Sequence, residues 1–152
     1  MNPNIQPRGE YDKRAAELNK LIRSVHYPNA VEAVVCDYDN ETFITATAPF
    51  RDEPEGGRRC RSCFELRLRE TAKYASGSGC DYFATTLTVS PHKDADLINE
   101  IGAGLAPEFG VSYLISDFKK HDGFKRSIEL SKQYGLYRQQ YCGCMPCPGN
   151  RE

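Results

Sequence analysis

The 152-residue sequence has no apolar run near the roughly 18 residues that a membrane-spanning helix needs. Its first eight residues lack the apolar stretch of a secretory signal. No Gly-x-Gly-x-x-Gly and no Walker-type loop is present, so no motif indicates a nucleotide cofactor. Neither sign of charge is in large excess, and the formal net charge of −1 gives no indication of partners. These absences predict a cytoplasmic protein without membrane contact.

Cysteine, by contrast, is abundant, with seven residues in the chain. An odd number of cysteines cannot form a closed set of disulfides, and the cytoplasm is reducing. Metal binding or redox catalysis is therefore the leading explanation for them.

Length and composition predict one domain with a hydrophobic core, because 39% of the residues are hydrophobic and 27% are charged. Basic residues gather in two segments, namely Arg58, Arg59, Arg61, Arg67 and Arg69, and Lys119, Lys120, Lys125 and Arg126. Such segments suit an anionic ligand such as an RNA backbone. A pair of solvated helix faces is the simpler explanation.

The spacing of apolar residues predicts helices and strands in alternation. Helices are expected at residues 11–25, 58–76, 91–105 and 123–133, and strands at 31–36, 81–89 and 111–115. The stretch 37–57 is expected to be a loop with at most a short helix. Alternation favours an α/β fold, a parallel sheet with helical crossovers. We expect a core domain over residues 1–136 and a cysteine-rich tail over 137–152, packed on the core.

Cys60 and Cys63 lie at the predicted start of a helix, where residues three apart share a face and point at one metal or cluster. The helix N-terminus and three neighbouring arginines are expected to lower the pKa of these thiols. Zinc, an iron–sulfur cluster and a redox dithiol all remain open as uses of the pair.

Cys142 and Cys144 are separated only by Gly143, which permits an unusual backbone. A disulfide between them would close a small, strained ring of the kind used in catalysis or regulation. Cys147 forms a second metal-like pair with Cys144. A non-catalytic zinc-binding module built from Cys144, Cys147 and the earlier Cys-x-x-Cys pair is the alternative.

Other chemically capable residues lie on or beside the predicted strands. Cys36 and Cys80 are expected to be small buried hydrophobes. His92 and Asp37 follow the ends of strands, where parallel sheets bind ligands. An exposed histidine in a helix-capping segment is the competing interpretation of His92.

Several ordered segments together resemble one family. They include Asn-Pro-Asn-Ile at 2–5, Glu-Gly-Gly-Arg-Arg-Cys-Arg-Ser-Cys at 55–63, Ser-Pro-His-Lys at 90–93, Phe-Lys-Lys-His-Asp-Gly-Phe-Lys-Arg-Ser at 118–127 and Tyr-Cys-Gly-Cys at 141–144. Over nearly its whole length the chain resembles epoxyqueuosine reductases of the QueH type. The resemblance implies reduction of epoxyqueuosine in tRNA to queuosine, with an electron donor that the sequence does not identify.

The resemblance also implies an α/β fold of the nucleotide-hydrolase-like HUP group and a 4Fe–4S cluster, with an additional iron ion beside it. By this resemblance Cys60 and Cys63 are cluster ligands, and Cys142 and Cys144 are a redox-active, disulfide-forming pair. His92 and Asp37 are candidates for protonating the leaving oxygen.

The chain differs from the family at its start. The family begins with a strand ending in Cys-Cys, a helix and a second strand that runs into Asn-Pro-Asn-Ile, whereas Met1 stands just before that motif. We therefore expect this chain to be shorter at its N-terminus than the family and to lack two cluster ligands and the first strands. An inactive fragment of the reductase is the corresponding alternative.

Overall fold

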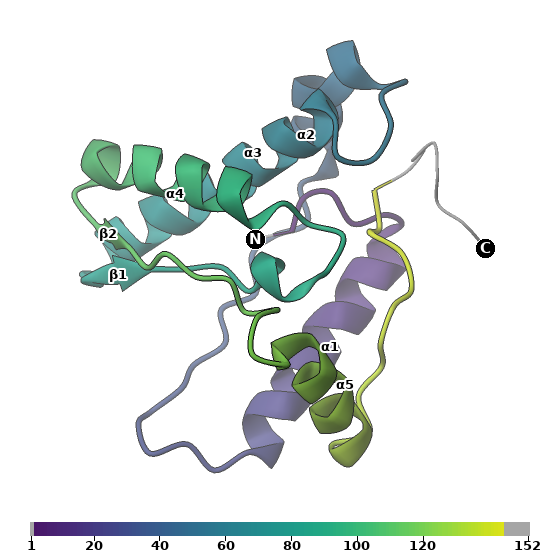
Figure 1. Ribbon diagram of the computed structural model, residues 1–152, viewed down its shortest axis with the longest axis vertical. Helices are drawn as coiled ribbons and strands as arrows, with labels where there is room; N and C mark the ends of the chain where they lie inside the picture. Colours follow the sequence, from purple (N-terminus) through teal and green to yellow (C-terminus); the bar gives the residue numbers. More distant parts are fainter. Residues whose placement is uncertain (1, 145–152) are drawn as a thin grey trace.

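The computed structural model describes residues 2–144 (Figure 1). The α-helices within these residues are α1 (Arg8–Ser24), α2 (Asn40–Thr47), α3 (Arg58–Gly77), α4 (Ala95–Phe109) and α5 (Gly123–Gln133). The strands are β1 (Tyr82–Phe83) and β2 (Ser112–Tyr113), and 3₁₀ turns occupy Ala48–Phe50 and Leu87–Val89. No helix within residues 2–144 is both long enough and apolar enough to cross a membrane.

The two strands form a small parallel sheet, in which Tyr82 lies opposite Ser112 and Phe83 opposite Tyr113. Helix α4 connects them, because parallel neighbours need a crossover rather than a tight turn. The expectation of an α/β fold with a parallel sheet and a helical crossover is confirmed in this coarse form.

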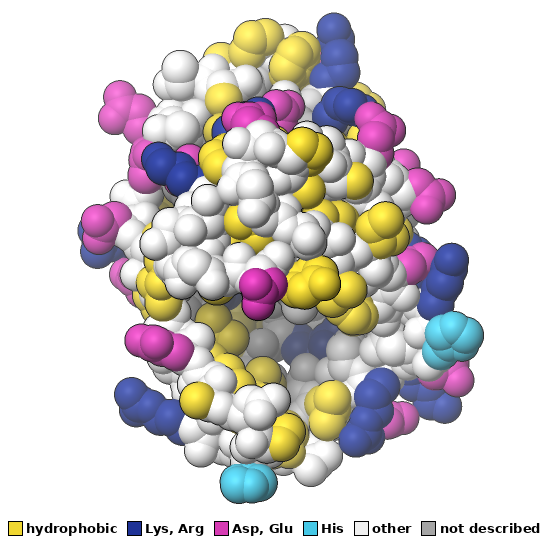
Figure 2. Space-filling model, turned by 90° about the vertical axis from the view of Figure 1, so that its left-hand side faces the viewer, with side chains coloured by type: hydrophobic (Ala, Val, Ile, Leu, Met, Phe, Trp, Pro, Cys, Tyr) yellow, Lys and Arg dark blue, Asp and Glu magenta, His cyan; other side chains and the backbone are white. Residues whose placement is uncertain are grey.

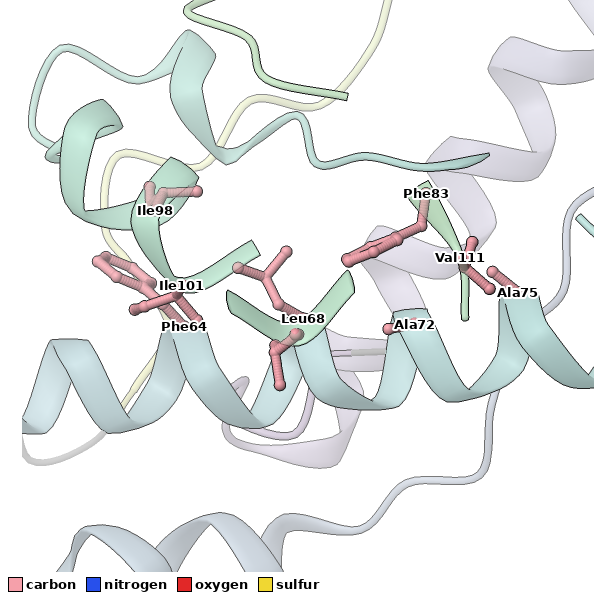
Figure 3. Packing of buried hydrophobic residues seen from close by; sticks show 9 residues of the cluster. Phe64, Leu68, Ala72, Ala75, Phe83, Ile98, Ile101 and Val111 are labelled. Carbon is pink, nitrogen blue, oxygen red and sulfur yellow. The ribbon is translucent and has the colours of Figure 1, made fainter. Parts of the chain in front are cut away.

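The main core lies between α3, α4 and the sheet (Figure 3). Helix α3 contributes Phe64, Leu68, Ala72 and Ala75, which recur at steps of four and three as an amphipathic helix requires. The other buried members of the cluster are Phe83, Ile98, Ile101, Leu105 and Val111. The apolar face of α3 is thus the face that is buried.

The four predicted helices are confirmed, with small shifts at their ends. Helix α4 begins where the Asp94 carboxylate accepts a hydrogen bond from the Leu97 amide at 3.0 Å. The 37–57 stretch holds one short helix, α2, whose start is capped by Asp39 in the same way.

The strand predictions were less successful. Residues 31–36 form no strand: they lie in an extended segment that loops away from the sheet, with Val31, Val34 and Val35 each nearly half exposed (Figure 1). A strand needs a hydrogen-bonded partner, and this segment meets none in the described sheet. The other two strands are shorter than predicted, each with two residues in the ladder.

Candidate functional site

Helix α1 positions the C-terminal segment that carries the second cysteine pair (Figure 1). The Lys20 ammonium donates to the Gly135 carbonyl at 2.5 Å, and Glu17 accepts from the Tyr137 amide at 2.8 Å. Arg14 then donates to the carbonyl of Cys142 at 3.2 Å. The segment is therefore fixed along α1 as far as the Cys-Gly-Cys motif.

Gly143 allows the chain to turn between the two thiols. Its φ is +100°, in the region that favours glycine, and its carbonyl accepts from the Gln6 amide at 2.8 Å. A Cβ on Gly143 would lie 3.2 Å from an Arg14 guanidinium nitrogen. The expected special backbone at this position is confirmed.

A second glycine turn places the first cysteine pair. Gly56 has φ +92°, and its amide donates to the Cys60 sulfur at 3.3 Å. The Glu53 carboxylate accepts from the Arg58 amide at 2.6 Å and so caps the start of α3. A Cβ on Gly57 would lie 2.7 Å from that carboxylate, so the Gly-Gly sequence permits the close approach.

The fold brings the second cysteine pair against Cys63 of the first pair, while Cys60 packs on the main core. Cys63 and Cys144 are both buried against Phe43 of α2, and Cys142 packs on the same cluster. All six cysteines of the described residues are free thiols, so no disulfide joins Cys142 and Cys144 in the structure.

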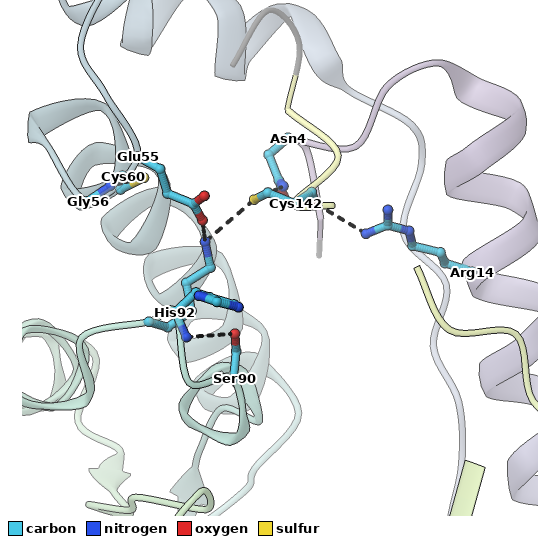
Figure 4. A network of polar contacts seen from close by, with 9 residues as sticks. Asn4, Arg14, Glu55, Gly56, Cys60, Ser90, His92 and Cys142 are labelled. Carbon is cyan, nitrogen blue, oxygen red and sulfur yellow. Dashed lines mark hydrogen bonds and ion pairs between the residues drawn. The ribbon is translucent and has the colours of Figure 1, made fainter. Parts of the chain in front are cut away.

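Lys93 connects this cluster to the loop before α3 through its contacts with Cys142 and Glu55, two residues that Figure 4 labels. Its ammonium lies 2.6 Å from a Glu55 carboxylate oxygen and 3.7 Å from the Cys142 sulfur, and only 11% of its side chain is exposed. The buried Asn4 presents its amide nitrogen to the same sulfur at 4.0 Å. A cation from the loop before α4 and a polar amide from the segment before α1 thus face the Cys142 sulfur.

These contacts set the charge of Cys142. The hydrogen bond from Cys144 lowers the pKa of the Cys142 thiol to about 5, against the effect of burial, and the Lys93 ammonium contributes in the same direction. Burial alone would lower the pKa of Lys93, but the Cys142 thiolate and Glu55 raise it above its ordinary value. At neutral pH Cys142 is therefore a thiolate and Lys93 is an ammonium.

The prediction of activated thiols at Cys60 and Cys63 is wrong. Burial raises the pKa of Cys60, and it raises the pKa of Cys63 to about 11. Two of the arginines expected to lower these values are engaged elsewhere, since Arg58 pairs with Glu53 and Arg61 with Glu100. Desolvation therefore outweighs the helix terminus and the nearby charges.

Within residues 2–144, no three His, Cys, Asp or Glu side chains are grouped so that they could hold a metal ion. Cys60 and Cys63, at adjacent turns of α3, fit two positions of a metal or cluster site, but these residues do not complete one. Cys147, a member of the zinc-site alternative, lies outside the described residues.

The remaining candidates lie in different surroundings. His92 is exposed in the loop before α4, where its amide donates to the Ser90 hydroxyl at 3.3 Å, and Asp37 is exposed in the extended segment after α1. Cys80 is exposed, and Cys36 is only partly buried, so the expectation that both are buried is wrong. Cys80 follows the turn that ends α3, and Cys36 belongs to the segment that forms no strand, so neither enters the core.

Sequence reasoning missed Lys93, Asn4 and Glu55 as neighbours of the thiols. Asn4 belongs to the Asn-Pro-Asn-Ile motif, Glu55 precedes Gly-Gly, and Lys93 ends Ser-Pro-His-Lys. Their positions in these motifs were the only sign in the sequence that they could belong to the site. The contact between them needed the tertiary structure, because they lie 38 residues or more apart along the chain.

The basic segments are largely neutralised by ion pairs. Arg69 pairs with Glu65 and Glu108, and Lys119 and Lys120 both pair with Asp117. Figure 2 shows basic and acidic side chains intermixed on one face, with hydrophobic side chains around a hollow. The simpler interpretation of these segments as solvated helix faces holds only in part, because Arg59 is buried and Lys119 and Lys120 lie in the turn before α5.

A cavity of about 330 Å³ opens at the carboxyl end of β1. Its lining residues are Asn2, Arg67, Leu68, Thr71, Ala84, Thr85, Thr86 and Phe118. Arg67 donates a hydrogen bond to the Asn2 side chain, and it lies one turn beyond Cys63 on α3. Arg67 therefore joins the cavity wall to the cysteine cluster.

Comparison with known proteins gives one consistent result. The family model described as "Epoxyqueuosine reductase QueH" matches residues 1–147. Curated proteins of that name are 41% identical in Streptococcus pyogenes, over 95% of this chain and 57% of that protein, and 41% identical in Staphylococcus epidermidis, over 95% and 62%. The protein of that name from Thermotoga maritima is 35% identical, over 95% of this chain and 74% of its own length. The chain thus spans about three fifths of the first two relatives.

Proposed function

This chain belongs to the epoxyqueuosine reductase QueH family, and from that membership we propose that it reduces the epoxide of epoxyqueuosine in tRNA to give queuosine. The observation that supports this most directly is the convergence of Cys142 and Cys144, from the C-terminal segment, with Cys63 of α3 on one buried cluster. We also assign the fold to the HUP group on the support of the parallel β1–α4–β2 unit.

In the proposed reaction Cys142 and Cys144 are the redox pair. The Cys142 thiolate is the electron-rich member, and Cys144 lies within hydrogen-bonding reach of it. Loss of an epoxide oxygen as water requires two electrons and two protons, which is what a dithiol releases when it forms a disulfide. The turn at Gly143 holds the two thiols close to each other. An electron donor from outside the chain must then reduce the pair again.

We further propose that Cys60 and Cys63 are two ligands of a 4Fe–4S cluster, a group that transfers single electrons. Both thiols have raised pKa values, so a bound cation would stabilise the thiolate form that burial disfavours. Because residues 2–144 hold no third ligand grouped with them, the remaining ligands lie outside these residues in this proposal.

The cavity beside β1 is the proposed contact for a nucleotide of the tRNA. Phe118 is 43% exposed at its edge, and an exposed aromatic ring suits the stacking of an unpaired base. Arg67 adds a guanidinium, and three threonines add hydroxyl groups. Recognition at a cavity agrees with the extensive ion pairing of the basic segments.

The test is anaerobic purification, followed by iron and sulfide analysis and a turnover assay on tRNA that contains epoxyqueuosine. We expect Cys60→Ala to abolish cluster absorbance and Cys142→Ala to retain it while losing turnover. Cys80→Ser is the matched control, because Cys80 is exposed, and this variant should behave as the wild type. Zinc without iron in the purified protein, or normal turnover by Cys142→Ala, would contradict the proposal.

A further inference from the structure

In the loop before α4, the side chain of Lys93 extends to the cysteine cluster and places its ammonium beside the Cys142 sulfur. Lys93 contacts the Cys142 sulfur, and its side chain is almost fully covered. Burying an ammonium is costly unless it is paired, and Glu55 provides the pairing at 2.6 Å. Glu55 accepts one N–H of the Lys93 ammonium. The same ammonium also lies 3.7 Å from the Cys142 sulfur.

The chemistry of the proposed reaction requires a proton at this place. When the epoxide becomes an alkene, both C–O bonds break, a C=C bond forms and the oxygen leaves as water. The two electrons come from Cys142 and Cys144, whose sulfurs form an S–S bond. Cys142 reacts as the thiolate, so one proton comes from the Cys144 thiol and the other from an acid beside the Cys142 sulfur, where the Lys93 ammonium lies at 3.7 Å.

We propose that Lys93 is the proton donor of the reaction: its Nζ, held by Glu55 beside the Cys142 sulfur, protonates the oxygen that leaves the epoxide. This inference rests on the proposed function and adds a catalytic residue to it. Cys144 supplies the second proton, so that atoms and electrons balance without any further reactant in this step. Lys93 takes the role for which His92 and Asp37 were the candidates from sequence, both of which have exposed side chains.

The surroundings of Lys93 place its ammonium between a carboxylate and a cysteine sulfur. The groups that face it are Glu55 from the loop before α3, Cys60 from α3 and Cys142 from the C-terminal segment, with the exposed His92 and Asp94 on either side. Lys93 thus lies between the carboxylate that holds it and the sulfur that is oxidised in the proposed reaction.

A purely structural role for Lys93, in tying the loop before α4 to the loop before α3, makes different predictions. Lys93→Arg keeps a cation that can pair with Glu55, but a guanidinium does not give up its proton. We expect this variant to fold, to retain rapid alkylation of Cys142 by iodoacetamide and to lose about 100-fold or more in kcat with little change in KM. Wild-type turnover by Lys93→Arg would overturn the inference.

Lys93→Ala provides a second, independent test. We expect its kcat to be partly restored by small primary amines such as ethylamine, with a rate that depends on the pKa of the amine. Glu55→Gln should retain turnover at a reduced kcat, because it loosens the ammonium without removing it. If the wild type fails to reduce epoxyqueuosine, the proposed function is wrong and the role of Lys93 falls with it. If the wild type turns over but no amine restores Lys93→Ala, only the assignment of Lys93 is wrong.

Discussion

At Cys142 the sulfur lies beside an ammonium and a hydrogen-bond donor, whereas at Cys63 it lies against Phe43 and other apolar side chains. The pKa of the Cys142 thiol is about 5, and that of Cys63 is about 11. At neutral pH one cysteine of the cluster, Cys142, is therefore a thiolate, and another, Cys63, is a neutral thiol. The local sequence does not distinguish them, because both occur in short Cys-x-Cys or Cys-x-x-Cys motifs.

Iodoacetamide should accordingly modify Cys142 well before Cys63 at pH 7, by at least about tenfold in rate, because the thiolate is the nucleophile. The measurement is peptide mapping by mass spectrometry after brief exposure of metal-free, reduced protein. The exposed Cys80 serves as the reference for access of the reagent. Equal labelling of Cys142 and Cys63 would contradict the charge states described above.

Glu10 provides a stability prediction that depends on pH. Although burial raises the pKa of its carboxyl, hydrogen bonds and charge from Arg14 and Tyr137 lower it below the ordinary 4.5, and its side chain is 10% exposed. A lowered folded-state pKa stabilises the protein above the unfolded pKa, and the contribution is lost as pH falls through the folded value. Glu10→Gln should therefore lower the free energy of unfolding at pH 7 by about 1.5–3 kcal/mol.

Urea unfolding at pH 7 and at pH values falling below 4.5 tests this expectation. The difference between Glu10→Gln and the wild type should shrink as the pH falls. The exposed Glu32 is the control, since Glu32→Gln should change stability little at any pH. A constant difference across the pH range would indicate that the loss comes from packing rather than from charge.

At the scale of elements, the packing of α4 on β2 depends on a glycine. A Cβ on Gly102 would lie 2.4 Å from ring atoms of Tyr113, a distance that real contacts do not reach. Tyr113 is itself held by a hydrogen bond from its hydroxyl to Asn99 at 3.1 Å, so the ring cannot move without loss. The small sheet is therefore attached to α4 through this close approach.

Gly102→Ala should destabilise the fold by about 1–3 kcal/mol through overpacking. Gly104, two residues along the same helix, has open space around it, so Gly104→Ala should be neutral or stabilising by up to about 1 kcal/mol. Urea unfolding of the two variants side by side gives the measurement. Equal stability of both variants would show that the sheet adjusts to the added methyl group.

At the scale of the whole molecule, charge is distributed in pairs rather than as one basic field (Figure 2). Arginines on one helix therefore differ in what they offer to an RNA. Arg67 lines the cavity and has the neutral Asn2 side chain as its hydrogen-bond partner, whereas Arg69 is paired with two glutamates. Arg67 can therefore pair with a negatively charged ligand, whereas the charge of Arg69 is already balanced by two carboxylates.

We expect Arg67→Gln to weaken tRNA binding by about 3- to 10-fold and Arg69→Gln to leave it almost unchanged, since a single exposed pairing is worth about 1 kcal/mol or less. Filter binding or fluorescence anisotropy at a fixed salt concentration gives the comparison. A larger loss for Arg69→Gln than for Arg67→Gln would move the RNA contact away from the cavity.

The sequence by itself determined the features that depend on local order. The periodicity of apolar residues identified α1, α3, α4 and α5, and the Cys-Gly-Cys motif indicated a special backbone at Gly143. The ordered motifs also indicated the family to which the chain belongs. The helices and the glycine turn could be predicted from sequence because helix periodicity and glycine backbone preferences act over a few residues.

Only the tertiary structure decided whether residues 31–36 would join the sheet. It also decided which thiols would ionise and where Lys93 would lie. A strand forms only where a partner supplies hydrogen bonds, so β-rich composition predicted a strand that the described sheet does not contain. Thiol pKa values depend on burial and on charges far along the chain, and burial outweighed the helix terminus at Cys60 and Cys63. The Lys93–Cys142 contact joins residues 49 positions apart, and such a contact follows from the packing of the whole chain.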